Sequence, residues 1–441
     1  MFSRKALTKL IVPLVIEQFL AVLVGMADIM MVSSAGEAAV SSVALVDLIN
    51  LLILNIFAAL ATGGAVVAAQ AIGARDRERA SHIANQLIYI VFGISVVITI
   101  LVLLLKGPLL RLLFGQVEQT VMAGAISYFA ITALSYPFIA VYNGGAALFR
   151  AMGNSKVSMG ISALMNAINI AGNALCVFGL GMGVEGVALP SVVSRAVAAV
   201  VILLLLRNPR NLVHLEHLFS FRFDPPLMSA ILRIGIPNSL ENSVFQLGRV
   251  LLVSLISTFG TVQIAANAVA NNLDGMGVIP GKAISLAMIT VVGRCVGARD
   301  DEQAIYYTRK LTLWAYIAMA LSNGAILIFL PKLIGIYALS GETMVLSELL
   351  VQIHAACAIL LWSPSFVLPN ALRAANDVKF TMVVSILSMA VWRLGFSYLL
   401  CSRLGWGAVG VWIAMVIDWI CRVTCFALRF GSGAWKTKYQ A

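Results

Sequence analysis

Carboxylate side chains occur inside apolar stretches of this sequence, where few polar groups surround them. Asp28 lies near the end of the first apolar run, and Glu17 lies earlier in the same run. A carboxylate in apolar surroundings is unfavourable unless it is protonated, paired or bound to a cation. Asp28 can therefore exchange a proton or a sodium ion when its access to water changes. The alternative is an acid that caps a helix end or lies at an interface.

Amide and hydroxyl side chains supply further oxygen atoms. Asn169 and Asn173 are four residues apart, so they share one face of a helix, and Ser191 lies early in the next apolar run. Hard cations such as Na⁺ bind to oxygen ligands of this kind. Asparagines that join two helices by hydrogen bonds explain the same pattern.

Two acids follow prolines in the same way. Glu17 is four residues beyond Pro13, and Glu241 is four residues beyond Pro237. Proline removes a backbone donor and bends a helix, so we expect the protein to flex at both prolines. Glu241 either couples to an ion or contacts a cation, or it forms a structural ion pair with Arg249, eight residues further on.

Other charges fall at helical spacing in the second half. Asp274 and Lys282 are eight residues apart, and Asp418 and Arg422 are four apart, which predicts neutralising pairs. If Lys282 instead lines a cavity without a partner, substrates would be zwitterionic or anionic. The sequence contains no HExxH, no Walker-type Gly-Lys-Ser/Thr and no nucleophile elbow. We therefore expect no enzyme activity, and energy from an ion gradient.

The composition determines the fold class. Of the 441 residues, 61% are hydrophobic and 11% are charged, whereas soluble domains carry about 25% charged residues. Long apolar runs predict an all-α polytopic membrane protein with twelve transmembrane helices. The predicted spans are 6–32, 40–72, 82–105, 121–149, 157–179, 184–206, 230–258, 264–296, 309–330, 347–372, 379–401 and 407–430.

The net charge of +11 is concentrated in the loops on one side of these spans. This positive-inside pattern predicts a multi-pass protein of the cell membrane with both termini in the cytoplasm. The basic charge is thus explained by topology in the lipid bilayer, and we expect no nucleic-acid partner.

The sequence repeats itself in the same order. Gly-Ala-Arg-Asp occurs at 73–76 and again at 297–300, and 297 − 73 = 224. A Gly-x-Gly-x-x-Gly motif recurs at the same offset, at 181–186 and 405–410. Two copies with six spans each predict two pseudo-symmetric six-helix lobes in parallel orientation. The lobes are residues 1–206 and 230–441, joined by a polar cytoplasmic linker at 207–229.

Four elements together resemble the MATE family (multidrug and toxic compound extrusion), within the larger MOP flippase superfamily. They are a first helix with Pro13 and Asp28, the two Gly-Ala-Arg-Asp loops, the Arg-Ala loops at 150–154 and 373–376, and the two Gly-x-Gly-x-x-Gly motifs. The resemblance implies the MATE fold, with two lobes around a central cavity. It also implies export of small amphiphilic organic compounds, often cationic, by alternating access in exchange for H⁺ or Na⁺.

The resemblance also implies the ion site. It places the family's coupling aspartate at Asp28 and, as in Na⁺-binding members, sets Asn169, Asn173 and Ser191 around it. Many relatives carry a second aspartate where this chain has Asn173, which leaves the choice between H⁺ and Na⁺ open. Glu241 matches a glutamate of NorM-like members, but the acid those members have in the tenth helix is missing from 361–365.

Two other functions compete with this one. A flippase for a lipid-linked sugar or another lipid would need a larger basic cavity that holds a diphosphate. An intramembrane enzyme would need a nucleophile and base or a metal cluster at membrane depth, and the sequence offers none. The sequence therefore predicts a monomeric antiporter without a cofactor other than its coupling ion.

Overall fold

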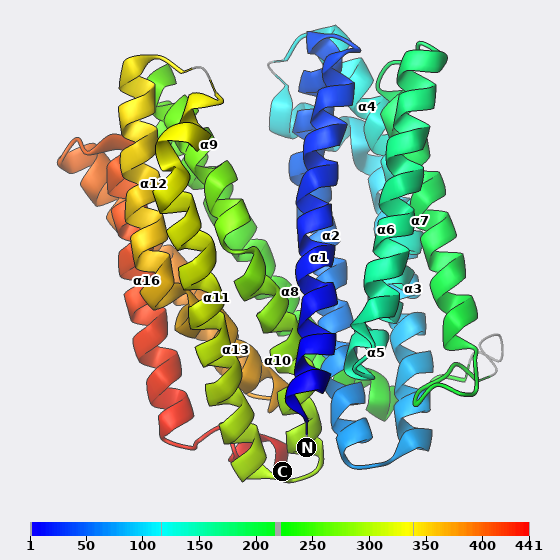
Figure 1. Ribbon diagram of the computed structural model, residues 1–441. Coiled ribbons are helices and arrows are strands. Elements are labelled where there is room, and N and C mark those ends of the chain that lie inside the picture. Colours follow the sequence, from blue (N-terminus) through cyan, green and yellow to red (C-terminus); the bar gives the residue numbers. More distant parts are fainter. Residues whose placement is uncertain (1, 116, 217–221, 338, 441) are drawn as a thin grey trace. The chain divides into compact units, whose positions relative to one another are not determined.

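The computed structural model describes residues 2–115, 117–216, 222–337 and 339–440, and every regular element in them is a helix (Figure 1). The chain forms two compact units. The first unit is residues 4–239, and the second unit is residues 240–441 together with residues 1–3. The division falls inside the long helix α8 (Pro225–Ser257).

The first unit is built from long helices followed by shorter ones. It contains α1 (Arg4–Ser33), α2 (Glu37–Gly73), α3 (Arg77–Phe114), α4 (Gln119–Ala133), α5 (Tyr136–Ala151), α6 (Ser155–Ala174), the π-helix η1 (Leu175–Gly179) and α7 (Glu185–Leu206). Its core is rich in small residues, because α2 buries both Gly63 and Gly64 among alanines and valines. Small residues let helix backbones approach closely, and α2 packs against α3 and α5.

The second unit repeats this order with more interruptions. It contains the rest of α8, α9 (Thr261–Gly277), α10 (Ile279–Gly297), α11 (Asp301–Gly335), α12 (Gly341–Trp362), η3 (Ser363–Val367), α13 (Leu368–Ala374), α14 (Val378–Leu387), η4 (Ser388–Gly395), α15 (Phe396–Tyr398), η5 (Leu399–Arg403), α16 (Gly407–Gly431) and α17 (Thr437–Gln440). The η segments are π-helices, whose turns are wider than those of an α-helix. In the first unit, α6 is α-helical where the second unit has η4.

The predicted all-α membrane architecture is confirmed. Ten helices of the described chain are long and apolar enough to cross a membrane, and eleven spans result if α4 and α5 are counted as one. The 33-residue α8 is not among the ten. Both α1 and α8 continue past their internal prolines, Pro13 and Pro237, so flexing at these residues stays a prediction.

Two predicted boundaries differ from the structure. The expected span 121–149 is divided into α4 and α5, which meet at 46°. Pro137 in the first turn of α5 has no backbone N–H to donate, so the α-helical ladder stops before it. In the linker, α8 begins at Pro225, where the Asp224 carboxylate accepts a hydrogen bond from Leu227 N at 3.1 Å. Residues 217–221 of that linker lie outside the described residues.

The repeated Gly-Ala-Arg-Asp motif forms a turn and a helix cap in each unit. Arg75 and Arg299 have positive φ angles of 62° and 55°. The next residue caps the following helix: Asp76 Oδ1 accepts from Arg79 N at 2.9 Å, and Asp300 Oδ1 accepts from Gln303 N at 3.0 Å. Each carboxylate satisfies a backbone donor in the first turn and lies at the positive end of the helix.

Replacing either cap, by Asp76→Ala or Asp300→Ala, is expected to destabilise the protein by about 1 kcal/mol. Thermal unfolding of the detergent-solubilised protein measures the loss as a lower midpoint. Glu78→Ala is the matched control, because this exposed acid also lies in the first turn of α3. Equal losses for Asp76→Ala and Glu78→Ala would show that the capping bond is not the cause.

Candidate functional site

The four residues proposed as the ion site form one hydrogen-bonded chain in the first unit. Asn173 Nδ2 donates to Asp28 Oδ1 at 2.8 Å and to Asn169 Oδ1 at 3.3 Å. Asn169 Nδ2 in turn donates to Ser191 Oγ at 3.0 Å. The chain of contacts thus joins α1, α6 and α7. The structure brings these side chains together, and their role in ion coupling stays a prediction.

The centre of this chain contains an unsatisfied acceptor. The Asn173 side chain is 0% exposed, and its Oδ1 atom has no hydrogen-bond partner among the described residues. A buried carbonyl oxygen without a donor is unfavourable. Next to the half-buried carboxylate of Asp28, it offers a second oxygen to a proton donor or a hard cation. The donor set of carboxylate, amide and hydroxyl oxygens therefore fits Na⁺ as well as H⁺.

A second acid, Asp47 on α2, belongs to the same network and was missed in the sequence. Tyr128 Oη and Asn50 Nδ2 each donate to Asp47 Oδ1 at 3.3 Å, and Tyr136 Oη donates to Asn50 Oδ1 at 2.6 Å. Asp47 also interacts electrostatically with Asp28. The signal that could have found it is the one used for Asp28, an acid inside an apolar run.

A buried arginine balances part of this negative charge. Arg195 on α7 interacts electrostatically with both Asp28 and Asp47, and its Nη1 atom donates to Ser135 Oγ at 2.7 Å. One arginine between two acids leaves the network one negative charge in excess. A cation or a proton would remove that excess.

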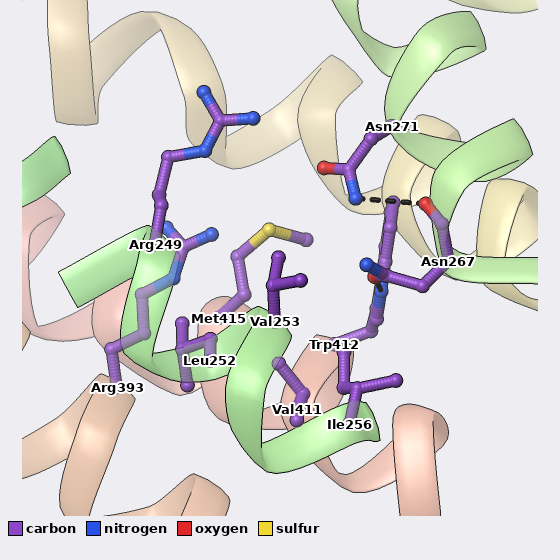
Figure 2. Close-up of a pocket in the computed structure, with 10 residues that line it drawn as sticks. All are labelled: Arg249, Leu252, Val253, Ile256, Asn267, Asn271, Arg393, Val411, Trp412 and Met415. Carbon is purple, nitrogen blue, oxygen red and sulfur yellow. Dashed lines mark hydrogen bonds between the residues drawn. The ribbon is translucent and has the colours of Figure 1, made fainter. Parts of the chain in front are cut away.

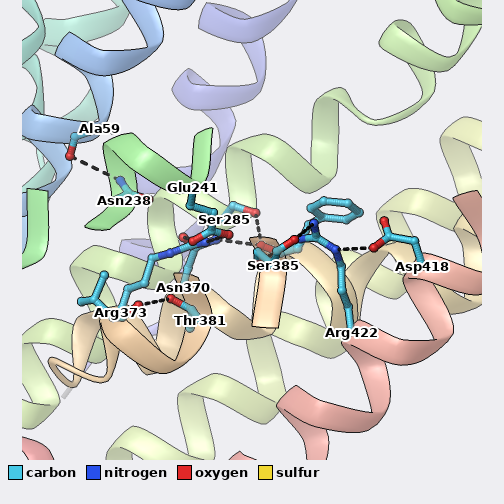
Figure 3. Close-up of polar contacts among 12 residues, drawn as sticks. Ala59, Asn238, Glu241, Ser285, Asn370, Arg373, Thr381, Ser385, Asp418 and Arg422 are labelled. Carbon is cyan, nitrogen blue, oxygen red and sulfur yellow. Dashed lines mark hydrogen bonds and ion pairs between the residues drawn. The ribbon is translucent and has the colours of Figure 1, made fainter. Parts of the chain in front are cut away.

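The two proline-linked glutamates form equivalent ion pairs. Glu17 Oε1 lies 3.4 Å from Arg150 Nη1, and Glu241 Oε1 lies 2.7 Å from Arg373 Nη2 (Figure 3). The expected partner of Glu241, Arg249, is therefore wrong. Eight residues on one helix are about 12 Å, whereas Arg373 approaches from a separate helix, α13. The pairing itself agrees with a structural role for both glutamates.

The predicted Asp274–Lys282 pair is also wrong. Asp274 Oδ1 lies 2.5 Å from Nε2 of the buried His354 on α12. The helix is interrupted at Val278, between α9 and α10, so the regular spacing assumed for the pair does not hold. Lys282 is exposed, and within the part of the chain that the structure describes its ammonium group forms no ion pair.

The Asp418–Arg422 pair is confirmed. Asp418 is 0% exposed, and its Oδ1 atom lies 3.1 Å from Arg422 Nε (Figure 3). Ser388 Oγ also donates to this carboxylate, and Arg422 Nη1 donates to Ser385 Oγ at 3.1 Å. Arg393 Nη1 approaches the other oxygen of Asp418 at 3.8 Å. A buried ion cluster thus holds η4, α14 and α16 together.

The second unit also contains a cavity of about 50 Å³, lined from α8, α9, η4 and α16. Figure 2 shows the guanidinium groups of Arg249 and Arg393 on one side and Asn267, Asn271 and Trp412 on the other. Trp412 Nε1 donates to Asn267 Oδ1 at 2.9 Å, and Asn271 Nδ2 donates to the Asn267 carbonyl at 2.8 Å. The cavity is therefore basic on one side and aromatic on the other.

Comparisons with known proteins agree with this architecture. The family model described as MatE matches residues 13–175 and 237–399. Because 237 − 13 and 399 − 175 both equal 224, the two matches reproduce the offset of the internal repeat.

Similar proteins and structures cover nearly the whole chain. It is 28% identical to the "uncharacterized transporter YisQ" of Bacillus subtilis, covering 97% of this chain and 94% of that protein. It is 26% identical to the "probable multidrug resistance protein NorM" of Thermotoga maritima, covering 99% and 94%.

Two solved structures show the same fold. One is titled an outward-facing multidrug resistance MATE transporter of the MOP superfamily (TM-score 0.91, 23% identity, 98% of this chain and 96% of that chain covered). The other is a MOP superfamily transporter from Pyrococcus furiosus, whose title reports a binding pocket of reverse polarity (TM-score 0.90, 23% identity, 98% and 96% covered). The chain is a multi-pass membrane protein and belongs to the MATE family, whose members are transporters and not enzymes.

Proposed function

We propose that this protein is a secondary active exporter of small amphiphilic organic compounds, cations foremost, in exchange for H⁺ or Na⁺. Relatives named as probable multidrug resistance proteins support the efflux function. We further propose that it works as a monomer in the cell membrane with both termini in the cytoplasm. The distribution of basic residues supports that orientation.

The observation that carries the proposal is the contact between Asp28 and the buried amide of Asn173, 2.8 Å apart, with its unpartnered oxygen. Binding of H⁺ or Na⁺ neutralises Asp28 and changes the hydrogen bonds that tie α1 to α6. The ion drives export only if it binds the two access states of the transporter with different affinities. We propose that the ion-bound state releases substrate outward, and that the ion-free state reloads from the inside.

Transport of a fluorescent organic cation into proteoliposomes tests the proposal. A pH gradient and a Na⁺ gradient are imposed separately, with an ionophore that collapses each one. We expect accumulation with at least one gradient and its loss with the matching ionophore. Accumulation that is equal with and without both gradients would contradict ion-coupled export.

The substitution Asn173→Asp is expected to strengthen the dependence of transport on Na⁺ by about ten-fold or more. It places a second carboxylate beside Asp28, and two nearby charges attract a cation much more strongly than one in a low-dielectric site. The Na⁺ concentration at half-maximal transport is the measured quantity. Asn166→Asp, on the same helix, is the matched control, and an equal effect of both substitutions would exclude a site at Asn173.

A flippase for a lipid-linked sugar or another lipid remains the second candidate. The cationic cavity of Arg249 and Arg393 is the observation in its favour, because a diphosphate needs basic partners. Its volume of about 50 Å³ is small for such a head group. A lipid-scrambling assay, run beside dye efflux on the same vesicles, separates the two functions.

A further inference from the structure

The cavity of the second unit is the repeat counterpart of the polar network around Asp28. Three of its lining residues stand at the repeat offset from members of that network or from Asp28 itself. They are Leu252 for Asp28, Asn271 for Asp47 and Met415 for Ser191, since 252 − 28, 271 − 47 and 415 − 191 all equal 224. The two sites therefore occupy the same place in the two copies of the fold.

The charge of the two sites is reversed. Both acids of the first copy, Asp28 and Asp47, are replaced in the second copy by residues without charge. Two guanidinium groups are present instead: Arg249, and Arg393, which falls within one residue of the counterpart of Asn169. A site that suits a cation in the first unit has thus become one that suits an anion in the second.

Both guanidinium groups retain hydrogen-bonding capacity. Within the described residues, Arg249 forms no hydrogen bond and no ion pair. Arg393 lies over the Phe245 ring at 5.4 Å and 3.8 Å from Asp418, while its Nε atom is buried without a partner. Asp418 is held more closely by Arg422, at 3.1 Å. Planar guanidinium groups with free donors bind carboxylate and phosphate oxygens in a bidentate manner.

The surrounding charges do not neutralise these arginines. Arg249, Arg393 and Arg422 interact electrostatically with one another and with Asp274 and Asp418. The two acids are already engaged, Asp274 by His354 at 2.5 Å and Asp418 by Arg422. Lys282 adds one more positive charge to the group. An excess of positive charge within membrane-spanning segments is unfavourable, and it is typical of a site that binds an anion.

The size of the cavity limits what it can hold. About 50 Å³ accommodates about four water molecules, whereas sites for a complete small molecule measure about 300–1,000 Å³. Trp412 and Met415 supply an aromatic and apolar wall beside the arginines. We propose that this cavity is a subsite for an oxyanion, the carboxylate or phosphate group of an amphiphilic substrate. The proposal rests on the export function above and narrows its substrates to amphiphiles that carry such a group.

The test is equilibrium binding to the purified full-length protein in a neutral maltoside detergent, which contributes no lipid phosphate. The probes are a rhodamine dye with a free carboxylate and its methyl ester, which differ only at that group. Fluorescence anisotropy should show tighter binding of the free acid to the wild-type protein. Arg249→Gln should weaken binding of the acid by about ten-fold or more and leave the ester unchanged, since a charge-assisted hydrogen bond is lost.

Two further variants keep the test decisive. Arg249→Lys retains the charge and should restore part of the preference for the acid. Arg403→Gln removes an exposed arginine of η5 outside the cavity and should change neither affinity. Equal binding of acid and ester to the wild-type protein would overturn the proposal. So would an equal loss of both dyes in Arg249→Gln.

Competition identifies the source of the oxyanion. A short-chain fatty acid and a short-chain phosphatidate are each titrated against the bound free-acid dye. Displacement by the fatty acid points to carboxylate substrates, and stronger displacement by phosphatidate points to lipid phosphate. Displacement by neither would overturn the oxyanion subsite. Because these assays use no gradient, they can fail while ion-driven export of the ester stands, and they can succeed when no gradient drives transport.

Discussion

Replacing Asp28 by asparagine is expected to reduce gradient-driven extrusion to background while the amount of protein in the membrane stays unchanged. Asparagine has nearly the shape of aspartate and keeps an oxygen that can accept from Asn173 Nδ2, now at 2.8 Å from Asp28 Oδ1. The substitution therefore removes the charge and the site of protonation with little change in packing. A group that no longer changes charge cannot bias the access states in response to an ion.

Dye efflux from energised vesicles measures this effect, with the protein level determined by immunoblot. Glu37→Gln is the matched control, because Glu37 is an exposed acid in the first turn of α2 and contributes no hydrogen bond to the Asp28 network. Asp28→Glu should retain part of the extrusion, since the ionisable group is kept. Wild-type extrusion by Asp28→Asn would remove this residue from the coupling mechanism.

The substitution Asp418→Asn is expected to destabilise the protein by about 3–5 kcal/mol. Asp418 is 0% exposed and lies 3.1 Å from Arg422 and 3.8 Å from Arg393. Loss of its charge leaves two arginines without their common counter-ion in the interior of the second unit. A buried charge without a partner carries a large desolvation penalty, which is why the expected loss exceeds the net stabilisation by the intact pair.

Thermal unfolding in detergent, followed by the loss of monodisperse protein, measures this destabilisation. The double substitution Asp418→Asn with Arg422→Gln should recover part of the midpoint, because one of the two unpaired charges is then absent. Glu342→Gln, an exposed acid in the first turn of α12, is the control for a lost carboxylate. An unchanged midpoint for Asp418→Asn would mean that the cluster does not stabilise the unit.

The sequence predicted the helices and the first-unit network well for identifiable reasons. Spanning helices need about 20 apolar residues, so their existence is written in composition alone. Asn169 and Asn173 share a face because they are four residues apart, and this local geometry holds in α6. Their contact with Asp28 on another helix came only from the family resemblance.

Partners from distant helices could not be predicted in this way. Spacing along one helix suggested Arg249 for Glu241 and Lys282 for Asp274, but the actual partners are Arg373 and His354. These lie on helices more than 70 residues away in the chain, since 354 − 274 = 80. Tertiary packing decides which long side chains meet. Periodicity within a single helix carries no information about it.

The π-helix η4 has a consequence for how the two copies have diverged. The start of α14 follows the start of α6 by 223 residues (378 − 155), whereas η5 follows η1 by 224 (399 − 175). One residue has therefore been inserted between these points, and η4 is the wide turn that absorbs it. Such an insertion rotates the side chains near it by about 100° around the helix axis. A single-codon insertion could thus have turned Arg393 toward the cavity while every later element kept its place.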